Sequence, residues 1–150
     1  MQEFIKYREL FPNAFPFESL LALYAKHPAA LHFETSDVVY RIAITGVIDQ
    51  AFFLPSILED KNRARYAATR ITSISLADWS VSCYTIKEDA YKTLCLLKKY
   101  QPPALLAAGI IRKGTGPWAR TNDWSGKKVN SHVDWWIFEE TTPFTDFEVV

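Results

Sequence analysis

The sequence has few cysteines, no net charge and no long apolar run. Cys83 and Cys95 have neither a Cys-x-x-Cys spacing nor a histidine nearby, so the pattern predicts no metal site. Lysine plus arginine and aspartate plus glutamate both number 17, so no overall field favours nucleic acid, a membrane or an acidic substrate. No segment approaches the roughly 20 apolar residues of a membrane span, and the charged start MQEFIKYREL is unlike a signal peptide. We therefore expect a soluble, cytoplasmic protein with reduced thiols, and neither a membrane nor a nucleic-acid partner.

Several motifs of nucleotide-binding and hydrolytic enzymes are also missing. The run GTG at residues 114–116 lacks the spacing of a Walker loop, and the Gly-x-Gly-x-x-Gly fingerprint of dinucleotide-binding folds does not occur. Ser73, Ser75, Ser80 and Ser82 lie close together, but none has the Gly-x-Ser-x-Gly surroundings of a nucleophile elbow. The sequence therefore predicts neither a P-loop nor a serine hydrolase.

Aromatic residues and an uneven charge distribution are what the sequence does contain. The 150 residues have the length of one domain, 1–150, and 15% aromatic content can fill its core. Residues 61–128 carry 13 basic and 4 acidic side chains, whereas residues 129–150 carry 5 acidic and none basic. This asymmetry predicts either a basic face for an anionic ligand or acidic ends that fold back over the basic middle. We favour the second.

Hydrophobic spacing predicts a first helix between Pro16 and His27 and a strand over residues 37–46. Arg41 is expected on the less apolar face of that strand. A helix in two pieces is expected over residues 50–68, and a short strand over 70–76. The strongest helix signal is the run of residues 85–99, which opens with a Thr-x-x-Glu capping box, Thr85 and Glu88, and stops before two prolines.

The last third of the chain reads as sheet. An apolar run at residues 104–111 predicts a central strand, and residues 114–131 show no periodicity, which predicts a long loop. The runs HVDWWIF (132–138) and FTDFEVV (144–150) predict a β-hairpin across a short turn. The expected fold is thus α+β, with an N-terminal helical half and a mixed or antiparallel sheet that this hairpin completes.

The run HVDWWIF also predicts part of a site. Side chains alternate along a strand, so His132, Asp134 and Trp136 share one face. That face can hold a polar ligand against Trp136, with Asp134 orienting His132 as a base or donor. The alternative interpretation is an edge strand whose polar end is solvated, and we favour it.

The preceding loop, residues 114–128, adds a second element. Arg112 and Arg120 bring positive charge, glycines let the backbone bend closely around a bound group, and Trp118 and Trp124 interleave with the cations. Phosphate-bearing ligands are held by such mixtures of backbone donors, cations and aromatic rings. We therefore predict contact with a ligand or partner in this segment.

The order of three segments resembles ADP-ribosyltransferases. These are an arginine on an early strand (Arg41), a Thr-Ser-Ile-Ser strand that contains Ser73, and a late acidic segment. The resemblance implies that Arg41 and Ser73 bind NAD and that a late glutamate stabilises the reaction. The matching late position here is Asp134, an aspartate, while Glu139 and Glu140 fall in the expected turn.

Two main hypotheses follow, and a nucleic-acid binder that uses the basic middle of the chain is a third, weaker possibility. The first is a domain that binds a small anionic, nucleotide-like ligand or a protein partner through the 114–128 loop and the His132/Asp134/Trp136 face, with no metal. The alternative is an ADP-ribosyltransferase-like enzyme that uses NAD as its cofactor, with Asp134, His132 or Glu139 as catalytic candidates. The sequence leaves open whether the protein is an enzyme and what its oligomeric state is.

Overall fold

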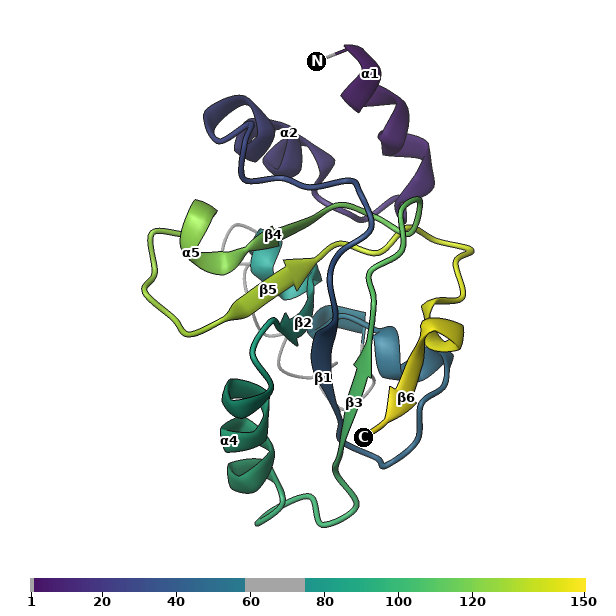
Figure 1. The fold of residues 1–150 in the computed structure, drawn as a ribbon. Coiled ribbons are helices and arrows are strands. Elements are labelled where there is room, and N and C mark those ends of the chain that lie inside the picture. The colour runs from purple at the N-terminus through teal and green to yellow at the C-terminus, as the bar shows by residue number, and fades with distance from the viewer. Residues whose placement is uncertain (1, 59–74) are drawn as a thin grey trace.

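The computed structural model describes residues 2–58 and 75–150. In this part of the chain the strands form one antiparallel sheet in the order β4-β5-β2-β1-β3-β6 (Figure 1). The strands are Val39–Ala43 (β1), Val81–Tyr84 (β2), Leu105–Gly109 (β3), Trp118–Arg120 (β4), His132–Trp135 (β5) and Phe147–Val149 (β6). Helices combined with this sheet confirm the predicted α+β class.

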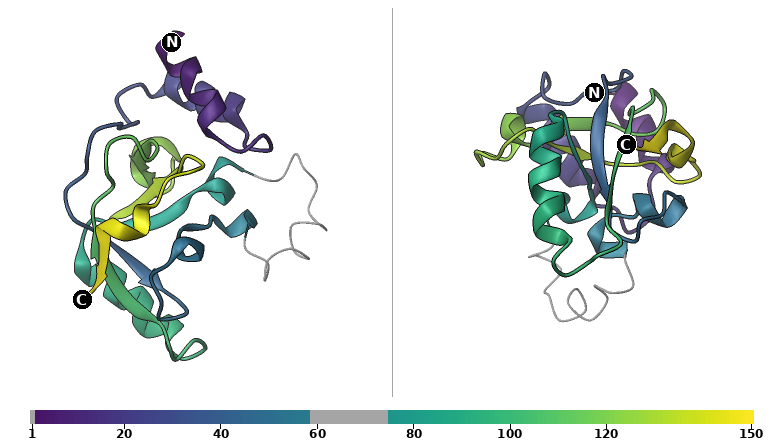
Figure 2. Two further views of the ribbon diagram at one scale, coloured as in Figure 1. Left: turned by 90° about the vertical axis from the view of Figure 1, so that its right-hand side faces the viewer. Right: turned by 60° about the horizontal axis from the view of Figure 1, so that its bottom comes forward.

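Helices lie at both ends of the sheet (Figures 1 and 2). The α-helices are Gln2–Ile5 (α1), Phe17–Lys26 (α2), Lys87–Leu97 (α4) and Thr121–Trp124 (α5). Short 3-10 helices span Lys6–Leu10 (η1), Gln50–Phe53 (η2), Ser56–Leu58 (η3), Leu76–Trp79 (η6) and Pro143–Asp146 (η7). The pair α1 and α2 lies at one end of the molecule and α4 at the other.

Both faces of the sheet are covered by apolar side chains. One face packs against the aromatic rings of Phe52, Phe53 and Phe147, and the other is covered in part by α4. The strand residues alternate between these two cores, as a period of two requires. Arg41 shares the aromatic face with Val39 and Ala43, which are 1% and 0% exposed. The prediction that Arg41 lies on the less apolar side of its strand is therefore wrong.

The elements with the clearest local patterns are confirmed. The helix expected after Pro16 is α2, and it ends as predicted at His27. The strand expected over residues 37–46 is β1, and the apolar run after residue 104 contains β3. Of the expected helix over 50–68, the structure describes η2 and η3, and the remainder lies outside the described residues, as do residues 70–74 of the expected short strand. Leu76 begins η6 rather than ending a strand.

The helix α4 is confirmed, but its predicted capping box is wrong. Ile86 is the N-cap residue, so Thr85 stands one position too early to cap the helix. The backbone N–H of Ile86 donates instead to Oγ of Ser131 over 3.0 Å, and the N–H of Thr85 donates to the Ser131 carbonyl. A residue just before β5 thus satisfies groups at the start of α4.

The predicted C-terminal hairpin does not form. The strand β5 pairs with β2 and β4, whereas β6 pairs with β3 at the opposite edge of the sheet. Beyond β5 the chain stays beside the 115–117 segment, because Trp136 and Phe138 donate their N–H groups to the carbonyls of Pro117 and Thr115. The apolar alternation identified both strands, but it carries no information on which strands become neighbours.

The segment predicted as a long loop contains regular structure. Within residues 114–131 lie β4 and α5, and Trp118 pairs with Trp135 on one side and bridges to His32 on the other. Three residues are too short a strand to show periodicity, and their pairing partners are distant in sequence. This explains why the pattern gave no signal.

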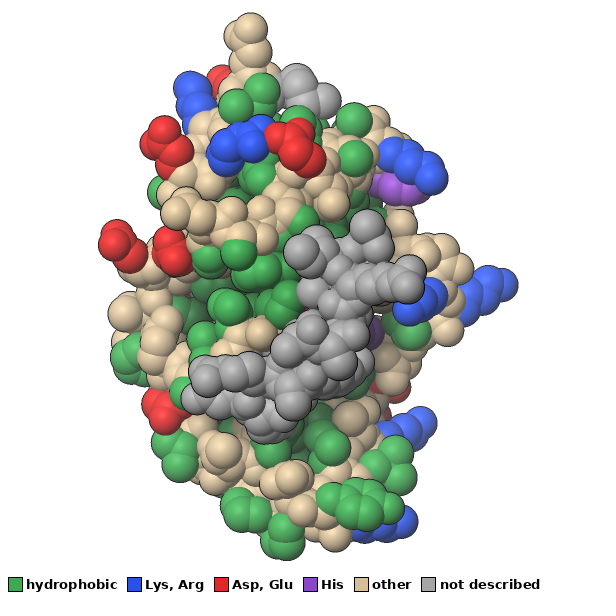
Figure 3. Space-filling view, turned by 180° about the vertical axis from the view of Figure 1, so that it is seen from behind, with side chains coloured by type: hydrophobic (Ala, Val, Ile, Leu, Met, Phe, Trp, Pro, Cys, Tyr) green, Lys and Arg blue, Asp and Glu red, His purple; other side chains and the backbone are tan. Residues whose placement is uncertain are grey.

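Charged side chains are unevenly spread over the surface. In Figure 3 the lysines and arginines gather chiefly along one edge and the aspartates and glutamates chiefly along the other. Among the described residues, one ion pair joins the basic middle of the chain to its acidic end, between Arg112 and Asp146. We predicted that the acidic ends fold back over the basic middle. In the part of the chain that the structure describes, the only ion pair between these regions is that of Arg112 with Asp146.

Candidate functional site

A pocket of about 670 Å³ lies between the strands β2 and β5 and the segment of α5 and the residues that follow it. Its lining includes side chains from each of these elements: Tyr84, Thr121, Trp124, Lys127, His132 and Asp134. The antiparallel register places Tyr84 opposite His132 and Ala119 opposite Asp134. The small side chain of Ala119 leaves room for the groups that gather around the carboxylate.

Asp134 is the buried centre of this site, with only 2% of its surface exposed. Its Oδ2 accepts hydrogen bonds from Oγ1 of Thr121 at 2.7 Å and from Nε1 of Trp124 at 3.1 Å. Its Oδ1 lies 2.6 Å from Oγ of Ser80, whose hydroxyl is also 2.9 Å from the carbonyl of Ala77. A buried carboxylate is costly unless such donors compensate it, and here three side chains do so.

Thr121 links this carboxylate to His132. Its Oγ1 lies 2.6 Å from Nδ1 of His132, while its single hydroxyl proton is directed to Asp134. The hydroxyl therefore accepts from Nδ1, which must carry the proton. In the neutral imidazole the other nitrogen, Nε2, is then the unprotonated one. Among the described residues, Nε2 has no hydrogen-bond partner.

Burial lowers the pKa of His132, and the positive charge of Arg41 lowers it further, while the carboxylate of Asp134 acts in the opposite direction. The ring of Tyr84 stands edge-on to the imidazole, with 5.5 Å between their centroids. At neutral pH the neutral form is therefore favoured, so the site offers an imidazole with a free acceptor nitrogen rather than a fixed positive charge.

The segment after α5 is held in place by its own hydrogen bonds. Asn122 and Val129 are joined twice, through Nδ2 to the carbonyl at 2.9 Å and through the N–H to Oδ1 at 2.8 Å. Ser125 receives the N–H of Lys127 at 3.1 Å and donates to the carbonyl of Thr121 at 2.7 Å. These contacts fix the backbone that carries Lys127 to the pocket. In the described part of the chain, Lys127 has no ion-pair partner.

Of the predicted site residues, Trp124, His132 and Asp134 come together in this pocket. Trp136 does not reach it as a surface group. Its ring is fully buried, stands edge-on to Trp124, and donates its N–H to the carbonyl of Leu76 at 3.0 Å. The expectation that Trp136 lies on an exposed face beside His132 is thereby corrected, since the chain after β5 turns this ring into the core.

Trp118 also belongs to the core, on the other face of the sheet. It is 9% exposed, stacks on His32 with 4.4 Å between ring centroids, and donates its N–H to the carbonyl of Glu34. The predicted loop surface that unites Trp118 with Trp124 is therefore wrong. Trp118, on β4, and Trp124, at the end of α5, pack in separate clusters.

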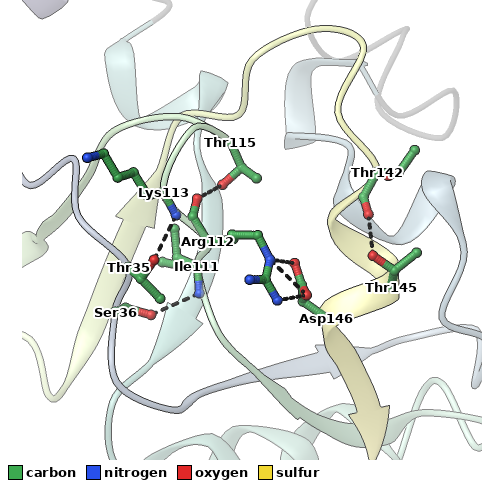
Figure 4. Close-up of polar contacts among 9 residues, drawn as sticks. All are labelled: Thr35, Ser36, Ile111, Arg112, Lys113, Thr115, Thr142, Thr145 and Asp146. Carbon is green, nitrogen blue, oxygen red and sulfur yellow. Dashed lines mark hydrogen bonds and ion pairs between the residues drawn. The ribbon is translucent and has the colours of Figure 1, made fainter.

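The predicted arginines lie apart from the pocket. Figure 4 shows Arg112 in a forked contact with Asp146, with nitrogen–oxygen distances of 3.1 and 2.6 Å, which raises the pKa of the guanidinium. The same view shows Ile111 and Lys113 held by hydroxyls of Ser36 and Thr35. Arg112 therefore secures the C-terminal segment, while Arg120 is exposed on β4.

The residues of the ADP-ribosyltransferase resemblance are also separated. Arg41 donates to the carbonyls of Phe52 and Ser82 and does not line the pocket that contains Asp134. Glu139 is exposed, and its N–H donates to the carbonyl of Leu10. Ser73 lies outside the described residues. Arg41, Asp134 and Glu139 thus do not line one cavity.

Sequence reasoning missed Ser80, Tyr84 and Thr121 as parts of this site. Ser80 is 54 positions from Asp134, so no local pattern links them. Thr121 was hidden in a segment interpreted as loop, where its place at the start of α5 could not be seen. From the sequence we considered Ser80 only as a nucleophile, a role that we rejected, and not as a donor to a carboxylate.

Comparisons with protein-family models, with curated proteins and with solved structures found no match for this chain. In the described residues no cluster of histidine, cysteine, aspartate and glutamate is suited to hold a metal ion. None of the helices there has both the length and the apolar character needed to cross a membrane.

Proposed function

We propose that the pocket beside β5 binds a small anionic ligand. The observation that carries this proposal is the convergence of a lysine with no ion-pair partner among the described residues, an imidazole and two aromatic rings on one pocket of about 670 Å³. Pockets for small molecules have volumes of roughly 300–1,000 Å³ and combine apolar walls with a few polar groups. The pocket of Lys127, His132, Trp124 and Tyr84 has this composition.

The charges support an anion rather than a cation. Asp134, the one carboxylate among the described residues of the lining, already accepts from Ser80, Thr121 and Trp124 and is 2% exposed. Its negative charge therefore offers little to a ligand. Lys127 lines the pocket and is exposed, and its ammonium group is a point charge suited to phosphate or carboxylate.

Trp124 provides both a wall and a reporter. Of the five tryptophans, the other four are at most 9% exposed, whereas Trp124 is half-buried in the pocket lining. Its N–H is held by Asp134, so the indole plane is fixed before a ligand arrives. A fixed ring reduces the entropy lost on binding.

The test is a fluorescence titration of the whole chain with inorganic phosphate, phenyl phosphate and adenosine monophosphate. We expect Trp124 emission to respond to at least one of them, and Lys127→Ala to weaken that response. Lys128→Ala is the matched control, because Lys128 is the next residue and equally exposed but does not line the pocket. Silence towards all three probes, or equal losses in both variants, would falsify the proposal.

A protein partner at the same surface is the competing outcome. It predicts no response to the three small anions together with a complex or self-associated species in solution. The described residues give no support to NAD as the ligand, since Arg41 does not line the pocket that contains His132 and Asp134. A cytoplasmic location also belongs to the proposal, on the ground that both cysteines are free thiols.

A further inference from the structure

We infer that the ligand of this pocket carries a hydrogen-bond donor, a hydroxyl or amino group, in addition to its anionic group, and that Nε2 of His132 accepts from this donor. The inference rests on the proposed function and names the chemistry of the ligand more closely. It disfavours anions without a hydrogen-bond donor, such as sulfate, as the preferred occupant. A phosphorylated sugar or nucleotide has both groups.

The first step is the direction of the hydrogen bonds. A carboxylate can only accept, so Asp134 receives the proton of the Thr121 hydroxyl over 2.7 Å. Because the only hydroxyl proton of Thr121 is directed to Asp134, Oγ1 of Thr121 can only accept a hydrogen bond from His132. The 2.6 Å contact between Oγ1 and Nδ1 therefore fixes the imidazole proton on Nδ1. The tautomer of the imidazole is therefore set by a buried group, and not by the ligand.

The second step is what remains for a ligand. His132 lines the pocket, and in the described part of the chain nothing bonds to its Nε2. A neutral imidazole held in this tautomer presents a lone pair at Nε2. A bare anion would meet this lone pair with repulsion, whereas a hydroxyl or amino group would donate to it. Lys127 remains for the anionic group.

The charge of His132 decides which ligand is preferred. Among the residues that the structure describes, its charged and titratable neighbours are Asp134 on the same strand, Tyr84 on β2, Arg41 on β1, Lys127 after α5, and Asp89 of α4, which accepts from the N–H of Ser131. Burial lowers the pKa of His132 and favours the neutral imidazole, although the negative charge of Asp134 raises that pKa. Protonation at lower pH would turn Nε2 into a donor, which favours a bare anion and disfavours a ligand that itself donates.

The experiment compares adenosine monophosphate, which has hydroxyl and amino donors, with phenyl phosphate, which has a ring and a phosphate but, as the dianion that predominates at about pH 7.5, no such donor. Affinities are measured by calorimetry at about pH 7.5 and about pH 5.5, on either side of the ordinary range of histidine. The ratio of the two affinities cancels the titration of the phosphate that both ligands carry. At the higher pH we expect adenosine monophosphate to bind about fivefold more tightly than phenyl phosphate. This factor corresponds to one net hydrogen bond. The ratio should fall towards one at the lower pH.

His132→Phe should bring the ratio towards one at both pH values, because it keeps a ring and removes the acceptor. An unchanged ratio in this variant would overturn the inference while leaving the anion site intact. If no probe binds to the wild-type protein, the proposed function and this inference fail together.

Nitrogen NMR of the wild-type protein gives an independent readout that needs no ligand. We expect His132 to be protonated on Nδ1 near neutral pH, and Thr121→Val to abolish this fixed tautomer while Thr121→Ser retains it. A wild-type imidazole protonated on Nε2 would overturn the inference. The protein has three histidines, so the signals can be assigned by single substitutions.

Discussion

The indole N–H of Trp124 donates to Oδ2 of Asp134 over 3.1 Å, and this contact joins the segment after β4 to the centre of the pocket. It combines a surface-facing ring with a carboxylate that is 2% exposed. The same hydrogen bond therefore contributes to the stability of the protein and to the shape of the pocket. Its removal should change both.

Trp124→Phe should lower the free energy of unfolding by about 1.5–3 kcal/mol, the range for a hydrogen bond to a charged group, because Asp134 loses one of its three donors. Trp118→Phe is the matched control. It also removes an indole N–H, but that group donates to a neutral carbonyl, of Glu34, and the loss should be nearer to about 1 kcal/mol. Urea unfolding measures the free energy of unfolding of both variants. Equal losses in the two variants would contradict the prediction that a hydrogen bond to the buried carboxylate of Asp134 stabilises the protein more than one to a neutral carbonyl.

The stability of the fold should depend on pH through His132. Burial lowers its pKa in the folded state, so below about 6.5, its ordinary value, the unfolded chain binds a proton that the folded protein resists. The contribution of His132 to the free energy of unfolding is therefore fully present above that pH, and it is lost as the pH falls towards the folded-state pKa.

His132→Gln should remove this part of the pH dependence, so the wild type and the variant should converge in stability as the pH is lowered from about 7.5 to about 5.5. Urea unfolding at several pH values measures both curves. His27→Gln serves as the control, because His27 lies at the end of α2, away from the pocket. Parallel curves for the wild type and His132→Gln would show that His132 does not resist protonation in the folded protein.

The two thiols should differ sharply in reactivity. Cys83 is fully buried between the β-strands, which raises its pKa to about 12, whereas Cys95 is exposed on α4. Because the thiolate is the reactive form, a thiol reagent at neutral pH should label one group in the folded protein and two after unfolding. Cys95→Ser should abolish the fast phase and Cys83→Ser should leave it unchanged. Fast labelling of Cys83 would mean that the core opens readily.

The sequence predicted those elements whose signal lies within a few residues. The helix between Pro16 and His27 and the strand β1 follow from spacing alone, because each buries one recurrent set of side chains. The partners of β5 and β6 could not be predicted, because pairing depends on which surfaces meet after folding. The start of α4 illustrates this, since its N-cap contact comes from Ser131, 45 positions away.

The candidate site was predicted in part for the same reason. The alternation that puts His132 and Asp134 on one face is local, and the structure has both in the pocket lining. Whether a tryptophan is a wall of a pocket or a part of the core depends on where the tertiary fold places its ring. Trp136 finds the carbonyl of Leu76 and Trp118 that of Glu34, while Trp124 finds Asp134. No pattern in the sequence distinguishes these three.

Two glycines in the segment before β4 provide a test of how that segment is held. Gly114 and Gly116 both have positive φ angles, 92° and 136°, so a side chain strains the backbone at either position. At Gly114 an added Cβ meets nothing within 4 Å, whereas at Gly116 it would overlap the carbonyl of Trp136. Gly114→Ala should therefore cost about 1–2 kcal/mol, the strain alone.

Gly116→Ala should cost more than about 3 kcal/mol, because backbone atoms must also move apart. The movement would separate residues 115–117 from the chain after β5, where Trp136 donates its N–H to Pro117. Since the ring of Trp136 stands edge-on to Trp124, the emission of Trp124 should change in Gly116→Ala and not in Gly114→Ala. Urea unfolding and fluorescence spectra of the two variants check both statements. Equal stabilities would show that the close approach of these two segments does not hold Trp136 in place.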